Sequence, residues 1–120
     1  MNSDELKSRT KALAIEIIRL TKKLPRLDES RIISNQIFQS VTSTAANYRA
    51  VLKARSDAEF FSKISIVVEE IDETLFWIEM IEEIGLLSEE EIKYPKKEAS
   101  ELLFIFSATR KSIRAKSRKN

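Results

Sequence analysis

The stretch SDAEFFSKISIVVEEIDETLFWIEMIEEIG, residues 56–85, decides the fold of this chain. Its apolar residues return every three or four positions, which is typical of one face of an α-helix. Ser56 and Glu59 form a capping box, the pattern that marks a helix start, and Gly85 suits the left-handed residue that ends a helix. The stretch therefore predicts one long helix over residues 57–84.

Three further segments of the 120-residue chain carry the same periodicity. They predict helices near residues 3–24, 29–54 and 95–114, followed by a basic tail over 114–120 that is expected to fray. No internal repeat or linker divides the chain. We therefore predict a single all-α domain over residues 1–120, an antiparallel up-down-up-down four-helix bundle.

Capping residues and prolines mark the predicted helix boundaries. Pro25 ends the first helix, because the residue before a proline disfavours the helical conformation. Asp28 or Ser30 can cap the second helix. The segment Ser88–Glu91 is another capping box, which we expect to open a short turn that Tyr94-Pro95 interrupts before the fourth helix begins.

The composition excludes most kinds of catalytic site. One glycine cannot build a glycine-rich phosphate loop or the many tight turns of a β-sandwich or barrel. Without cysteine there is no disulfide, zinc ribbon or thiol nucleophile, and without histidine there is no serine–histidine triad and little basis for catalytic zinc. We expect no enzymatic activity and no cofactor.

Charge is segregated along the chain, although the net charge is only +2. Residues 1–63 carry 12 Lys and Arg against 7 Asp and Glu, residues 64–109 carry 3 against 12, and residues 110–120 carry 6 against none. Such segregation gives a helical protein basic and acidic faces, which serve orientation, self-association or the binding of a polyanion. The alternative is that these are ordinary solvated helix faces.

Localisation is predicted from two absences. The acidic start of the chain is not followed by the apolar segment of a secretory signal, and no apolar run approaches the ~18–20 residues of a membrane span. We expect a cytoplasmic protein that does not enter a membrane.

The second predicted helix has an unusual centre of short and hydroxylated residues, Ser40–Ala46. Such residues weaken intrinsic helicity, so we interpret them as a place where a neighbouring helix approaches closely. The alternative is a hydroxyl-lined contact surface. The inward positions of this helix are predicted to be Ile33, Ile37, Val41, Thr44, Ala45, Tyr48 and Leu52.

Large apolar residues exceed what one bundle core needs. Several fall off the main stripes of their helices, and such residues on two or three helices indicate a second buried surface. We therefore predict self-association through the outer edges of the helices. The candidate interface residues are Ile15, Leu20, Phe61, Ile66, Phe76, Met80, Phe104 and Ile105.

The acidic cluster Glu69, Glu70, Asp72 and Glu73 could suggest a metal site. Di-iron bundles, however, combine their glutamates with histidine, which this chain lacks. We expect no metal, and instead salt bridges from this cluster to cations of the first two helices.

The strongest binding candidates are basic residues at helix ends. In an up-down-up-down bundle, the end of the second helix, the start of the third and the end of the fourth meet at one pole. Phosphate binding needs little more than such a patch. The candidate nucleic-acid-binding residues are Arg49, Lys53, Arg55, Lys63, Arg110, Lys111, Arg114, Lys116, Arg118 and Lys119.

Aromatic side chains could add base stacking to such a patch. The candidates are Tyr48, Phe76, Trp77 and Tyr94, although aromatics at helical spacing more often belong to a core.

Residues from the second and third predicted helices resemble a known family. They run from Asn35-Gln36-Ile37 through Ala45-Ala46-Asn47-Tyr48-Arg49-Ala50 and Arg55-Ser56-x-Ala58-Glu59-Phe60 to Glu69-Glu70-x-Asp72-Glu73-Thr74-x-x-Trp77 and Gly85-Leu86-Leu87. The sequence is similar to bacterial four-helix-bundle proteins encoded by intervening sequences in 23S rRNA genes, also called a 23S ribosomal protein family. The resemblance extends from Leu13 to Ile113.

This resemblance implies an antiparallel bundle that assembles as a ring, commonly a pentamer, with no enzymatic activity and with an undefined biochemical role. From this resemblance and the basic residues together, we expect a homo-oligomer that binds RNA or a nucleoprotein through its basic pole. A protein-interaction scaffold without nucleic-acid binding is the alternative. Four polar residues are expected to form hydrogen bonds between helices, namely Gln36, Asn47, Glu70 and Glu73.

Overall fold

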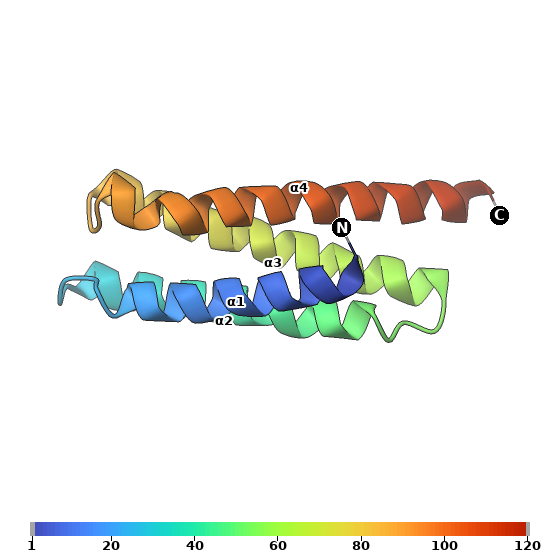
Figure 1. Cartoon of the computed structure of the whole chain (residues 1–120), viewed down its shortest axis with the longest axis horizontal. Helices are drawn as coiled ribbons and strands as arrows, with labels where there is room; N and C mark the ends of the chain where they lie inside the picture. The colour runs from blue at the N-terminus through green and yellow to red at the C-terminus, as the bar shows by residue number, and fades with distance from the viewer. Residues whose placement is uncertain (1, 120) are drawn as a thin grey trace.

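The computed structural model of the chain describes residues 2–119, with side chains over residues 2–116. It consists of four helices, α1 (Ser3–Thr21), α2 (Asp28–Val51), α3 (Asp57–Ile84) and α4 (Glu89–Lys119). The chain reverses direction at each connection, so neighbouring helices run antiparallel (Figure 1). The predicted all-α four-helix bundle is confirmed, and it is elongated, measuring 52 × 22 × 19 Å.

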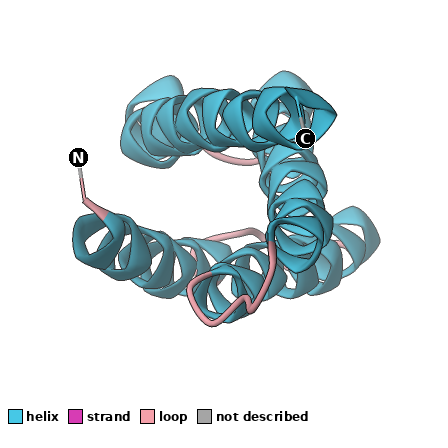
Figure 2. Cartoon of the chain, turned by 90° about the vertical axis from the view of Figure 1, so that its right-hand side faces the viewer, coloured by secondary structure: helices cyan, strands magenta, loops and turns pink. Residues whose placement is uncertain are grey.

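The helices do not pack equally against one another. α3 packs extensively against both α2 and α4, and α1 packs chiefly against α2, whereas α1 and α4 touch only lightly. Viewed along the bundle, α1 and α4 therefore stand apart at the two ends of an open arrangement (Figure 2). None of the helices in the described part of the chain is long and apolar enough to cross a membrane.

Ion pairs join the light α1–α4 contact and the α3–α4 contact. Arg9 of α1 donates two hydrogen bonds to Glu98 of α4, at 2.9 and 2.6 Å, and a third to Glu101 at 3.0 Å. The hydrogen bond to Glu98 raises the pKa of Arg9 despite the opposing effect of burial. Two residues before Glu98, Lys96 of α4 lies 2.7 Å from Glu82 of α3, and this hydrogen bond raises the pKa of Lys96.

The predictions of caps at both ends of α3 and of a capping box at Ser88–Glu91 are confirmed. The Ser56 hydroxyl accepts a hydrogen bond from the Glu59 backbone at 3.0 Å, and Gly85 ends α3 in the left-handed region with φ of 82°. Ser88 Oγ accepts from the backbone of Glu91 at 3.1 Å, while the Glu91 carboxylate accepts from the backbone of Ser88 at 3.0 Å. The hydrogen bonds that the Glu91 carboxylate accepts from the backbone and the hydroxyl of Ser88 lower the pKa of Glu91.

The predicted start of the fourth helix near residue 95 is wrong, because α4 begins at Glu89 and continues through Pro95. A proline inside a helix removes one backbone hydrogen bond and crowds the preceding turn. Here the capping box holds the first turn, and Ile92 and Pro95 are both buried, so packing offsets the missing bond. At its other end α4 extends to Lys119 rather than to residue 114, so residues 115–119, which were predicted to fray, belong to the helix, while Asn120 lies outside the described residues.

The predicted cap of α2 is also wrong. Leu27 is the capping residue and makes no side-chain hydrogen bond. Ser30 is instead 4% exposed, and its Oγ has no hydrogen-bond partner. Ser30 is the third residue of α2, and its side chain is buried instead of capping the helix.

The core agrees with the predicted faces except near helix ends. Leu20 is only 4% exposed, so its predicted place off the core face is wrong; it lies seven residues after Leu13, which is fully buried. Leu52 is 39% exposed, and Val51 takes the predicted inward position, because it lies seven residues after the buried Thr44. Two turns of helix return a side chain to nearly the same face.

The short side chains of α2 do allow a close helix approach. The hydroxyl oxygens of Ser40 on α2 and Thr74 on α3 lie 2.9 Å apart, and both residues are at most 1% exposed. Ser40 is thus part of the α2–α3 interface, which confirms the packing interpretation of this segment.

The α3 stripe should dominate stability. Replacing the fully buried Ile71 by alanine (Ile71→Ala) should lower the free energy of unfolding by about 2–5 kcal/mol, because it removes apolar contacts and leaves a cavity. The control Ile32→Ala, at a residue 52% exposed, should change it by at most about 0.5 kcal/mol. Urea titration followed by circular dichroism measures both, and equal losses would contradict the assignment of the core.

The left-handed turn at Gly85 should also be measurable. A Cβ there meets no atom within 4 Å, so Gly85→Ala should cost only the backbone strain of a left-handed residue, roughly 1–2 kcal/mol. Gly85→Asn should lose less, because asparagine tolerates this conformation. Thermal unfolding of the two variants should therefore rank them glycine, asparagine, alanine, and any other order would refute this account.

Candidate nucleic-acid interface

The predicted meeting of three helix ends is confirmed. The end of α2, the start of α3 and the end of α4 lie at the same end of the bundle (Figure 1, right). Lys116 of α4 lies 3.6 Å from Asp57 in the first turn of α3. We call this end the basic pole; its described cations are Arg49, Lys53, Arg55, Lys63, Arg110, Lys111, Arg114 and Lys116. The side chains of Arg118 and Lys119 lie outside the described residues.

Few of these charges are neutralised inside the bundle. Arg55 lies 3.7 Å from Glu59, and Lys116 pairs with Asp57, but both pairs are largely exposed. Exposed pairs of this kind contribute about 0–1 kcal/mol and leave the cations available to other anions. Within residues 2–116, six cations of the pole make no ion pair: Arg49, Lys53, Lys63, Arg110, Lys111 and Arg114.

Arg110 has a packing role instead. Its guanidinium carbon lies 5.6 Å from the centre of the Phe61 ring, a cation–π contact, and its Nε is buried without a hydrogen-bond partner. Phe61, a candidate for an oligomer interface, is half-buried beside this arginine. The two residues hold α4 against the start of α3.

The aromatic candidates do not form a stacking platform at the pole. Tyr48 is 5% exposed, its ring centre lies 4.9 Å from that of Phe106, and burial raises the pKa of its hydroxyl. Trp77 is half-buried in the last third of α3, away from the pole, where its ring lies edge-on to Phe76. Tyr94 is 53% exposed but belongs to the start of α4, at the opposite end of the bundle. The pole would therefore act through charge.

The predicted interhelix hydrogen bonds are wrong. Asn47 donates to the carbonyl of Ser43 at 2.9 Å, and Glu73 accepts from Trp77 Nε1 at 3.3 Å, so each bonds within its own helix. The side chains of Gln36 and Glu70 make no hydrogen bond among the described residues. The pKa of Glu70 is raised, mainly because the residue is partly buried and also because the negative charges of Glu73 and Glu69 are close.

The polar contacts that do join helices involve other residues, namely Ser40, Thr74, Arg9, Glu98, Glu101, Glu82, Lys96, Asp57 and Lys116. The sequence shows on which helix each of these residues lies. It does not show which of them pair, because pairing depends on how the helices are placed relative to one another.

Within the described residues, the acidic cluster of α3 forms neither a metal site nor the predicted salt bridges. No group of His, Cys, Asp or Glu within the described residues could hold a metal ion. The predicted salt bridges from Glu69, Glu70, Asp72 and Glu73 to α1 and α2 are wrong, because none forms within residues 2–116. Glu69, Asp72 and Glu73 are exposed, and their helical spacing places them on the outer side of α3, opposite its buried residues.

The predicted oligomer-interface residues divide by exposure. Ile15 is 43% exposed, Phe76 49% and Phe104 76%, so these three offer apolar surface to a partner. The remaining candidates, Phe61, Ile66, Met80 and Ile105, are partly buried. Leu20 belongs to the core and is unavailable.

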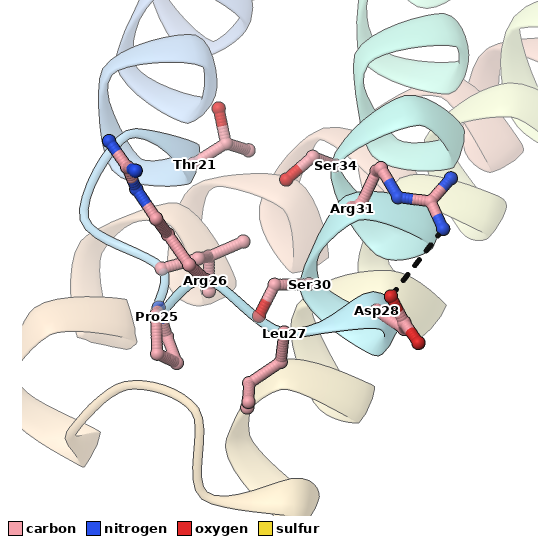
Figure 3. A pocket seen from close by; sticks show the side chains of 9 residues that line it. Thr21, Pro25, Arg26, Leu27, Asp28, Ser30, Arg31 and Ser34 are labelled. Carbon is pink, nitrogen blue, oxygen red and sulfur yellow. Dashed lines mark ion pairs between the residues drawn. The ribbon is translucent and has the colours of Figure 1, made fainter.

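Two surface hollows were not predicted. One groove of about 460 Å³ runs between α1 and α2 and is lined by Lys7, Lys11, Ala14, Ile15, Ile18, Thr42, Ala45, Ala46 and Arg49. A second hollow, of about 400 Å³, lies at the α1–α2 turn, where Arg26 and Ser30 border it and Arg31 lies 3.7 Å from Asp28 (Figure 3). Sequence periodicity could not reveal either, because each is formed between two segments.

Comparison with known proteins agrees with this architecture. The chain matches the family described as 23S rRNA-intervening sequence protein over residues 4–108. It is similar to a solved structure from Bacteroides thetaiotaomicron, a protein with unknown function from the S23 ribosomal protein family, with 27% identity and a TM-score of 0.80. That similarity covers 88% of this chain and 98% of the other. No curated protein is similar enough to count as a relative. Because the family match reaches into all four helices, this chain belongs to the 23S rRNA-intervening sequence protein family.

Proposed function

We propose that this protein is a non-enzymatic, cytoplasmic, oligomeric bundle that binds RNA, alone or within a nucleoprotein, through the basic pole. The observation that carries the proposal is the set of five cations from three helix ends, Arg110 not counted because it packs on Phe61, that make no ion pair within residues 2–116. A polyanion that contacts such cations releases its own counterions, which drives binding without any base-specific contact.

Oligomerisation would strengthen such binding. Each copy presents one basic pole, and a ring with several poles on one face would contact a single RNA at several places, which raises the overall affinity. The exposed apolar residues Ile15, Phe76 and Phe104 support self-association. The family resemblance suggests five subunits, and light scattering of the purified protein with and without RNA would measure both the subunit number and the RNA stoichiometry.

A protein-interaction scaffold without nucleic-acid binding is the second candidate. It is favoured by the acidic outer side of α3, which would repel RNA and suits a basic protein surface. The two candidates are distinguished by whether purified protein binds RNA in a salt-dependent manner.

Charge reversal at the pole should weaken RNA binding. The triple variant Lys53→Glu, Lys111→Glu and Arg114→Glu should lower affinity for a short fluorescein-labelled single-stranded RNA at least about tenfold. The dependence of log affinity on log salt should also become shallower by about 2, since each phosphate contact contributes about 0.7. Fluorescence anisotropy between about 50 and 200 mM salt measures both quantities.

The matched control reverses three exposed cations at the end of α1, namely Arg19→Glu, Lys22→Glu and Lys23→Glu. It changes the net charge equally but lies at the other end of the bundle, so its affinity should stay within about threefold of the wild type. Equal losses in the two variants would mean that only net charge matters, and the basic pole would not be a site.

Removal of residues 114–120 should also reduce RNA affinity, because it deletes four of the cations assigned to the pole. Ile113, which packs against the core, is retained, so the midpoint of thermal unfolding should change little. RNA affinity that is unchanged by this deletion would remove the end of α4 from the proposed site.

A further inference from the structure

The groove between α1 and α2 has an apolar floor and a basic rim. Ile15, Ile18 and the small side chains of Ala45 and Ala46 line it, and the cations Lys7, Lys11 and Arg49 stand around it. None of these three cations makes an ion pair within residues 2–116. Ile15 lines this groove of about 460 Å³, and 43% of its surface remains exposed there. The surface therefore suits an acidic partner with a protruding apolar side chain.

The outer side of α3 has the opposite character. Phe76 is 49% exposed, and carboxylates precede it by three, four and seven residues and follow it by seven. These spacings place the charges on the same helix face as the ring. We call this the acidic face; it consists of Phe76, Glu69, Asp72, Glu73 and Glu83, all exposed. None of its carboxylates forms an ion pair within the described residues.

We propose that the acidic face of one copy docks into the α1–α2 groove of a second copy. Phe76 would enter beside Ile15 and Ile18, and the carboxylates would meet Lys7, Lys11 and Arg49. Burial of the phenylalanine ring supplies apolar contact area, and the charge pairing fixes the orientation and disfavours groove-to-groove or face-to-face contacts. This inference rests on the oligomeric part of the proposed function and names the two surfaces involved; it does not depend on RNA binding.

The two surfaces can act at the same time on one copy. The groove is lined by residues of α1 and α2, whereas the acidic face belongs to α3, and Figure 2 shows that α3 stands beside this pair of helices rather than between them. Each copy can thus donate one surface and accept the other. Contacts of this head-to-tail kind build a closed ring when the rotation closes and a filament when it does not. In such an assembly Arg49 serves the subunit contact, and Lys53, Lys63, Lys111 and Arg114 of the basic pole remain available to RNA.

Charge reversal on either surface should disrupt the assembly. In light scattering without RNA, wild-type protein should exceed the 13.9 kDa of one chain. The variants Lys7→Glu/Lys11→Glu and Glu69→Lys/Asp72→Lys should each weaken association at least about tenfold, because like charges then face one another. All four residues are exposed, so circular dichroism should show unchanged helicity. The control Lys22→Glu/Lys23→Glu changes the charge of α1 equally outside the groove and should associate as the wild type does.

The decisive measurement is rescue. A chain that carries all four reversals restores opposite charges across the contact and should recover association to within about threefold of the wild type. An equimolar mixture of the two double variants should associate more strongly than either variant alone, because each groove finds a complementary face on a copy of the other variant. Wild-type protein that stays monomeric would refute both this contact and oligomerisation. An oligomer that the double variants leave intact, or that the fourfold variant fails to restore, would refute only the contact. RNA anisotropy on the same variants tests the basic pole separately.

Discussion

Burial of the inner stripe of α3 is the constraint on which the rest of the structure depends. Ile64, Val67, Ile71, Ile78 and Ile81 are all fully buried, and α3 packs extensively against both α2 and α4. One helix can serve two neighbours because its core stripe is wide, while the short side chains of α2 let the helices approach closely at Ser40. α1 and α4 have no comparable mutual contact and are joined mainly by the ion pairs of Arg9.

The arrangement around α3 also determines where charge accumulates. Because α2 and α4 both run antiparallel to α3, their ends meet the start of α3 and gather the cations of the basic pole (Figure 1). The exposed carboxylates Glu69, Asp72 and Glu73 near the middle of α3 form no ion pair within residues 2–116. The bundle buries its core stripes but leaves several large apolar side chains exposed and charges of both signs on separate sides, which favours partners outside the chain. The proposed RNA contact and subunit contact each use one part of this unsatisfied charge.

The sequence predicted the helices well, and it predicted their contacts poorly. Apolar periodicity identified α3 with its boundaries, and it identified most of the core. It misplaced Leu20 and Leu52 at helix ends, where the face turned toward the core shifts by one residue. Pro95 was taken as a boundary although burial of Ile92 and Pro95 carries α4 through it. Asn47 and Glu73 were expected to bridge helices, but a side chain at the right spacing can bond within its own helix instead.

By itself, the sequence determined that this chain is a helical bundle with segregated charge and without the residues that most catalytic sites require. Those properties follow from composition and from a periodicity of three to four residues, which are local. Only the tertiary structure decided which charges are paired, since Arg9 and Glu98 meet across 89 positions of sequence. It also decided that α1 and α2 enclose a basic groove and that the acidic side of α3 faces outward. Such features depend on the rotation and separation of whole helices, which are set by packing and are not written in any one segment.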